Sequence, residues 1–84
     1  MATIGWVDGW LTSLLRSDAG YQIEVVDAAG DVVLTTSPHP RVQDATNEAG
    51  AWTEAHPAPD YRRLTRRQAK NNPYLWAAWR SVGA

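Results

Sequence analysis

The sequence lacks cysteine and phenylalanine altogether, and its only methionine is the first residue. Without cysteine, the chain forms neither disulfides nor thiolate metal sites, which is typical of a protein in a reducing compartment. Without phenylalanine, the large apolar side chains come from five tryptophans and from leucine, valine and isoleucine. We therefore expect a core in which tryptophans pack with aliphatic side chains.

Long hydrophobic runs are also missing. The apolar runs are only a few residues long, whereas a helix needs about 20 apolar residues to span a bilayer. The first ten residues, MATIGWVDGW, lack the basic start and the continuous apolar stretch of a signal peptide. We therefore expect a cytoplasmic protein with no membrane partner.

Acidic residues are absent after Asp60, although the whole chain of 84 residues carries a net charge of only −1. Residues 1–60 hold nine acids and two bases, a net charge of −7, whereas residues 61–84 hold six bases and no acid. A chain of this length makes one domain. We expect residues 1–84 to form one compact domain, with an acidic part over 1–59 and a basic, tryptophan-containing helical part over 60–84.

The segment from Thr3 to Arg16 has its apolar residues at a helical period. At about 100° per residue, one half of the helical wheel carries Ile4, Trp6, Val7, Trp10, Leu11, Leu14 and Leu15. Two glycines weaken such a helix by roughly 1 kcal/mol each, so packing must hold it. We predict an amphipathic core helix here.

The stretch YQIEVVDAAGDVVLTT, residues 21–36, predicts a β-hairpin. Tyr21, Ile23 and Val25 alternate with other residues before the turn, as expected for a strand. Gly30 supplies the positive φ that a short loop needs, and Asp27 braces the turn through its side chain.

Helices are expected after the hairpin. Val42, Ala45, Ala49 and Trp52 recur at helical spacing, and prolines 57 and 59 end that helix. A second helix is predicted from Tyr61 to about Asn71 with Asp60 as its cap, although the residues Thr65-Arg66-Arg67-Gln68 also fit a capping box and leave a later start open. A third helix is predicted after Asn72 as cap and Pro73 as first helical residue. The sequence thus predicts an α+β fold of order α-β-β-α-α with two to three C-terminal helices. A short third strand near residues 38–41 is left open.

The basic residues of the second predicted helix share one face. Five of them occupy an arc of about 140° on a helix that begins at Tyr61. We expect Trp76 to be partly exposed and to stack on Arg80, four residues later. The predicted binding site consists of Arg62, Arg63, Arg66, Arg67, Lys70, Trp76 and Arg80.

Catalytic signals are weak in this sequence. His39 and His56 stand beside prolines in predicted loops, and their spacing from other ligand types matches no zinc or calcium pattern. No glycine-rich phosphate loop and no paired carboxylates are evident. We therefore expect a protein that is not an enzyme and that uses no metal or cofactor.

The basic face has three competing interpretations. It pairs with acids of its own chain or is simply solvated; it grips nucleic-acid phosphates, with bases stacked on an aromatic ring; or it docks on an acidic protein, since arginine and tryptophan are enriched at binding hot spots. We favour a larger protein or ribonucleoprotein complex as the partner of a monomer or homodimer.

No motif identifies a family. Short, cysteine-free, charge-segregated chains without catalytic motifs are similar in size and style to accessory proteins of phages and mobile elements, including anti-CRISPR inhibitors. That likeness implies an inhibitor that covers a site on a larger host complex. A nucleic-acid-binding module and a structural component of a virion or larger complex are the alternatives.

Overall fold

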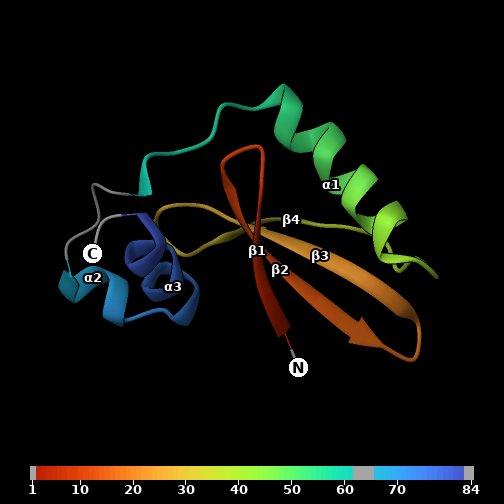
Figure 1. Cartoon of the computed structure of the whole chain (residues 1–84), viewed down its shortest axis with the longest axis horizontal. Coiled ribbons are helices and arrows are strands. Elements are labelled where there is room, and N and C mark those ends of the chain that lie inside the picture. Colours follow the sequence, from red (N-terminus) through yellow and green to blue (C-terminus); the bar gives the residue numbers. More distant parts are fainter. Residues whose placement is uncertain (1, 62–65, 83–84) are drawn as a thin grey trace.

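The computed structural model describes residues 2–61 and 66–82, which form a small α+β domain. Its strands are joined in sequence order into one antiparallel sheet, β1-β2-β3-β4. Helix α1 lies at the upper right of Figure 1 and helices α2 and α3 at the left, with the strands between them. The elements are β1 (Ala2–Val7), β2 (Trp10–Ser17), β3 (Gly20–Val26), β4 (Val32–Thr35), α1 (Val42–Ala55), α2 (Arg66–Lys70) and α3 (Pro73–Val82).

The predicted N-terminal helix over residues 3–16 is wrong, because this segment forms the hairpin of β1 and β2. The predicted order α-β-β-α-α is therefore wrong as well, and the chain begins with strands. Asp8 and Gly9 close the hairpin with φ angles of 51° and 83°, as a two-residue type I′ turn requires. An Asp-Gly pair between apolar runs is the sequence signal that the helical period concealed.

That helical period arises because β2 is covered on both of its faces. Trp10 and Leu14 contribute to a cluster on one side of the sheet, whereas Leu11 belongs to a cluster on the other side. A strand covered on both faces carries neighbouring apolar residues instead of a clean alternation. The resulting spacing of 10, 11 and 14 fits one face of a helix equally well.

The predicted hairpin over residues 21–36 is confirmed as β3 and β4. Asp27 accepts hydrogen bonds at Oδ1 from the backbone N–H groups of Ala29 and Asp31, both at 2.9 Å. Gly30 has a φ of 89°. Both predicted roles at this turn, the brace at Asp27 and the positive φ at Gly30, are therefore confirmed.

The predicted helix that starts at Val42 is confirmed as α1, which covers one face of the sheet, called here the α1 face. Ala45 and Ala49 are completely buried against Ile23 and Val25 of β3. Trp10 meets Trp52 edge-on, with ring centroids 5.0 Å apart. Two alanines one helical turn apart allow α1 to approach the sheet closely.

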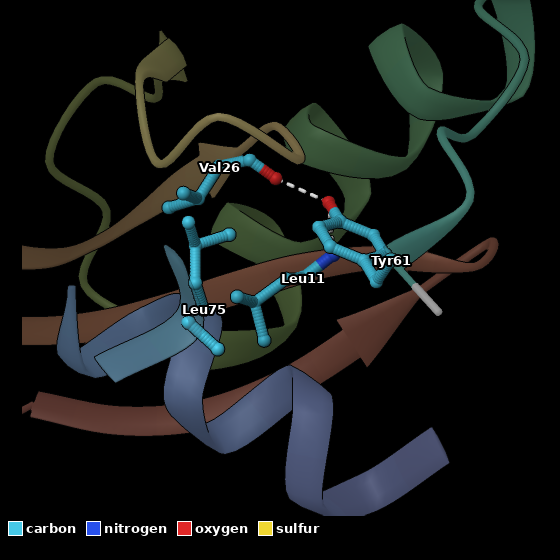
Figure 2. Packing of buried hydrophobic residues seen from close by; sticks show 5 residues of the cluster. Leu11, Val26, Tyr61 and Leu75 are labelled. Atoms are coloured by element: carbon cyan, nitrogen blue, oxygen red, sulfur yellow. Dashed lines mark hydrogen bonds between the residues drawn. The ribbon is translucent and has the colours of Figure 1, made fainter. Parts of the chain in front are cut away.

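The opposite face, called here the α3 face, is covered by α2 and α3. Its buried cluster consists of Leu11, Val26, Tyr61, Ala69 and Leu75, and Figure 2 shows four of these side chains converging. The Tyr61 hydroxyl lies between two strands. It accepts a hydrogen bond from the backbone N–H of Leu11 at 3.0 Å and donates one to the backbone carbonyl of Val26. Burial raises the pKa of this phenol above its ordinary value of 10.0.

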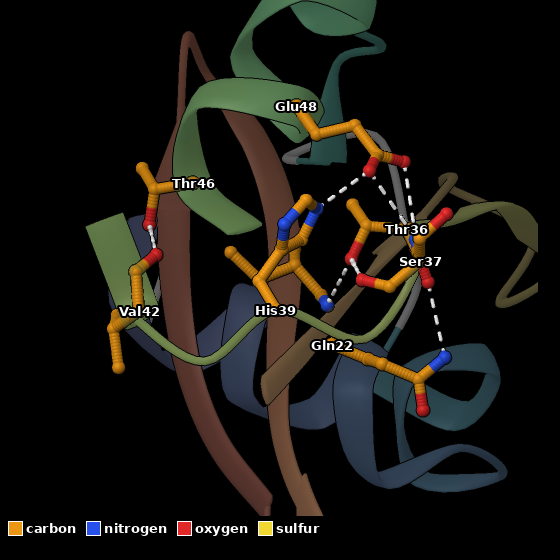
Figure 3. A network of polar contacts seen from close by, with 8 residues as sticks. Gln22, Thr36, Ser37, His39, Val42, Thr46 and Glu48 are labelled. Carbon is orange, nitrogen blue, oxygen red and sulfur yellow. Dashed lines mark hydrogen bonds and ion pairs between the residues drawn. The ribbon is translucent and has the colours of Figure 1, made fainter. Parts of the chain in front are cut away.

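Between β4 and α1 the chain remains hydrogen-bonded to β3 at two points, first where Thr36 meets Ile23 and then where His39 meets Tyr21. The N–H of Tyr21 donates to the carbonyl of His39 at 2.7 Å, and the N–H of His39 donates back at 2.9 Å. The strand left open near residues 38–41 is thus a one-residue bridge. Figure 3 shows how Glu48 of α1 fastens this segment: its carboxylate accepts from the Ser37 N–H and lies 2.7 Å from Nε2 of His39.

The C-terminal prediction is only partly retained. The break and restart at Asn72 and Pro73 are confirmed, since Oδ1 of Asn72 accepts the N–H of Tyr74 at 2.8 Å and α3 begins at Pro73. The described part of the second predicted helix is α2 over Arg66–Lys70, which agrees with the later of the two predicted starts. Tyr61, the earlier predicted start, lies outside any α-helix. Neither 2–61 nor 66–82 contains a helix both long and apolar enough to cross a membrane.

Candidate functional site

The described part of the predicted site lies on α2 and α3. Arg67, Lys70 and Arg80 are exposed, and Trp76 is partly buried. We call these four residues the basic surface. Arg62 and Arg63 lie outside the described residues, and of Arg66 the structure describes only the backbone position at the start of α2. The predicted arc of five bases on one helix therefore stays a prediction.

The described part of this surface contains a shallow, open hollow lined by Lys70, Pro73 and Trp76. The ammonium group of Lys70 lies 5.5 Å from the centroid of the Trp76 ring, within the range of a cation–π contact. The sequence predicted Arg80 as the cation over this ring; among the described residues, Lys70 lies over it. The turn at residues 71–72 brings the lysine back over the helix that follows.

The position of the hollow is fixed by the start of α3. Asn72 caps the helix with its side-chain oxygen and donates from Nδ2 to the carbonyl of Gly30 at 3.3 Å. Leu75 is buried with Leu11 and Val26, and Trp76 packs against the same cluster. The β3–β4 turn and the sheet core therefore hold one wall of the hollow in place.

Among the described residues, no acid is paired with the charges of Arg67, Lys70 and Arg80. Within residues 2–61 and 66–82, the recorded salt bridge is that of His39 with Glu48. The acids of α1 lie on the helix that covers the opposite face of the sheet. Asp27 and Asp31 are closer, because their turn contacts Asn72.

The chemistry of the hollow follows from its three lining residues. Lys70 offers a cation with three N–H donors, while Pro73 and Trp76 offer apolar and aromatic surface. Such a site favours a carboxylate or phosphate attached to a flat or apolar group. No hydroxyl, thiol, imidazole or carboxylate occurs among the residues that the structure describes as its lining.

Pro73 is the site residue that sequence reasoning missed. The sequence predicts Pro73 only as the first residue of a helix, yet this proline lines the hollow three positions before Trp76. The signal was the spacing itself, because residues i and i+3 lie on the same side of a helix. Proline is favoured at the first helical position because the N–H group that it lacks has no partner within the helix there, and Pro73 is exposed.

The two histidines take structural positions in the described chain. His39 pairs with Glu48, and the ring of His56 stacks on Trp52 at a centroid distance of 4.1 Å. Within the ranges 2–61 and 66–82, no three His, Asp or Glu side chains gather as a potential metal site. Comparison of the chain with protein-family models, curated proteins and solved structures found no match.

Proposed function

We propose that this chain is a non-enzymatic binding protein that docks on an acidic protein partner through its basic surface. The observation that carries the proposal is the placement of Lys70 over Trp76 beside Pro73, in an open hollow. The finer proposal is an accessory protein of a phage or mobile element that inhibits a larger host complex by covering one of its sites, as anti-CRISPR proteins do.

The electrostatics of the described residues support a protein partner. Arg67, Lys70 and Arg80 keep their charges without an acid from the described chain, so an external carboxylate finds them available. An aromatic ring beside these cations supplies the apolar contact that dominates binding energy at many interfaces. The neighbouring acids of the β3–β4 turn repel a continuous phosphate backbone but accept the mixed charges of a protein surface.

Nucleic acid is the second candidate, and the hollow itself favours it. The flat ring of Trp76 and the adjacent proline suit the stacking of a base, while Lys70 suits the phosphate next to it. Stacking of one base on an aromatic ring is worth about 1–3 kcal/mol. The acids of α1 oppose this less than their number suggests, because the sheet separates them from the basic surface.

Charge reversal tests the proposal. The variant Arg67→Glu/Lys70→Glu should stay folded, because exposed charges contribute about 0–1 kcal/mol to stability. It should lose at least about tenfold in affinity for the partner, identified by mass spectrometry after capture from host extract. The matched control is Arg16→Glu/Arg41→Glu, which changes the net charge equally at two exposed arginines outside the basic surface. Equal loss in both variants, or none in either, would place function elsewhere.

Salt dependence separates the two candidates. Binding of the wild type to a 20-nucleotide single strand and to a duplex is measured by fluorescence anisotropy between 50 and 300 mM salt (about the range in which phosphate contacts are lost). A nucleic-acid ligand predicts a log–log slope of about −0.7 per contact for the single strand and −0.9 for the duplex. A protein partner predicts no measurable binding to the single-stranded or the duplex nucleic acid. It also predicts that Trp76→Ala greatly weakens binding to the protein partner.

A further inference from the structure

The two edges of the sheet differ in how they are protected against pairing. Strand β4 has only four residues, its register with β3 shifts at Val25/Val26, and prolines 38 and 40 follow it. Strand β1 has six residues, pairs with β2 without a shift, and contains neither charge nor proline. Short length, irregular register and proline are the devices that keep edge strands from pairing. In the described chain, β1 has none of them.

The hairpin turn fixes which backbone groups of β1 point outward. In a hairpin closed by two residues, the flanking pair exchanges both hydrogen bonds, and bonded and non-bonded pairs alternate from there. The flanking pair is Val7 with Trp10. Residues 3, 5 and 7 therefore bond to β2, whereas Ala2, Ile4 and Trp6 direct their N–H and C=O groups away from the sheet.

The same residues bring apolar side chains to the edge. Ile4 and Trp6 are each 39% exposed, which is unusual for such large apolar groups on neighbouring positions of one face. Both lie on the α3 face, where the ring of Trp6 meets Tyr61 edge-on at 5.4 Å. In the described chain, the edge thus combines backbone groups that no other strand pairs with and large apolar side chains that are partly exposed.

We propose that β1 pairs with β1 of a second copy of this chain, antiparallel and centred on Ile4, to give a symmetric dimer with one continuous sheet. In this register Ile4 faces Ile4 of the second copy, and Trp6, the largest residue, faces the alanine at position 2. All outward-directed backbone groups at positions 2, 4 and 6 then find partners. A second copy fits because the strand is uncharged, so self-pairing opposes no like charges.

The size of this contact sets the strength of the dimer. Five paired residues per copy are far fewer than the roughly 20–30 per side of a standard stable interface. We therefore expect a dimer that dissociates on dilution. A two-fold axis perpendicular to the continuous sheet places both α3 faces on the same side. The dimer would present two basic surfaces to one partner, which raises avidity without a new contact.

Sedimentation velocity over a wide range of protein concentration tests the dimer. The wild type should change from monomer to dimer, and Ile4→Lys should raise the dissociation constant about tenfold or more, because two lysines then face each other across the axis. Val33→Lys is the matched control: it puts the same charge on an exposed valine of the other edge strand. It should leave the dissociation constant unchanged.

Cysteine pairing tests the register without a charge. Because the chain has no cysteine, Thr3→Cys and Gly5→Cys each introduce a single thiol. The proposed register places residue 3 of one copy opposite residue 5 of the other, in a non-bonded pair about 4.5 Å apart at Cα, within the range for a disulfide. A mixture of the two variants should form the mixed disulfide, whereas either alone should not. A wild type that stays monomeric at every concentration, or Val33→Lys as the disruptive variant, would overturn the proposal.

Discussion

The two helical layers of this domain are attached to the same sheet by different means. On the α1 face, Ala45 and Ala49 bring the helix close to β3, and the contact consists mainly of apolar and aromatic packing. On the α3 face, a buried hydroxyl completes the backbone hydrogen bonding between β2 and β3. The acidic helix thus packs on the sheet through apolar side chains and makes its polar contacts with turns and loops, such as that of Thr53 with Asp8. The basic part is held by a polar group that the strands themselves need.

This difference explains how one small chain keeps opposite charges apart. Asp44 and Glu54 are exposed on α1, and Arg67 and Lys70 are exposed on α2, with the sheet between the two layers. Direct contact between the layers would neutralise the charges and remove the basic surface. The sheet therefore acts as a separator as well as a core, and its two faces can be tested one at a time.

The largest effect is expected at Tyr61. Tyr61→Phe removes the hydroxyl and leaves the Leu11 N–H and the Val26 carbonyl without their partner in a buried place. Each unsatisfied buried group costs about 1–3 kcal/mol, so we expect a loss of about 2–4 kcal/mol in the free energy of unfolding. Urea denaturation followed by tryptophan fluorescence measures it.

Tyr74→Phe is the control for this variant, since Tyr74 is a partly buried tyrosine of the same layer. It should cost well under 1 kcal/mol. If Tyr61→Phe is as stable as the wild type, β2 and β3 close directly on each other, and the hydroxyl is not what attaches the α3 face.

A smaller effect is expected where the β3–β4 turn meets α3. Gly30→Val puts a β-branched residue at a φ of 89°, and its Cβ would lie 2.5 Å from Nδ2 of Asn72. We expect a loss of about 1–2 kcal/mol or more, measured by thermal unfolding. Ala29→Val, at the exposed neighbouring turn position, should change the melting temperature little. Equal effects of both variants would show that the loss comes from the turn in general and not from its contact with α3.

The smallest effect is expected on the acidic side, at Glu48. The hydrogen bond from His39 holds the pKa of Glu48 below its ordinary value of 4.5. A carboxyl whose pKa is lowered by folding adds stability that is complete above its unfolded pKa and is lost as the pH falls through the folded value. The carboxyl is largely solvated, so Glu48→Gln should cost only about 0.5 kcal/mol at neutral pH.

The pH profile of unfolding provides the check on this pair. The difference between wild type and Glu48→Gln should be present at neutral pH and should shrink as the pH falls below 4.5. A difference that persists at acid pH, where the carboxyl is protonated, would mean that the pairing with His39 is not its source. The source would then be the hydrogen bond from the Ser37 N–H, which the glutamine amide and a protonated carboxyl accept to different extents.

Local features of the sequence determined the parts of the fold that depend on neighbours along the chain. The turn at residues 27–31, the helix that starts at Val42 and the cap at Asn72 all follow from side chains bonding or packing within a few residues. The sequence predicts the candidate site in the same way, from the basic residues and tryptophans that gather near the C-terminal end of the chain. Each of these signals lies within one continuous segment of the chain, so no contact between distant segments is needed to interpret it.

The tertiary structure decided what distant contacts control. Whether residues 3–16 form a helix or two strands depends on β3, which pairs with β2 and so makes a hairpin more favourable than a weak helix with two glycines. The cation over Trp76 and the proline beside it depend on how the chain reverses between α2 and α3. A strand buried on both faces has the spacing of a helix, and only its partners distinguish the two, because hydrogen bonds between strands join residues that the sequence keeps apart.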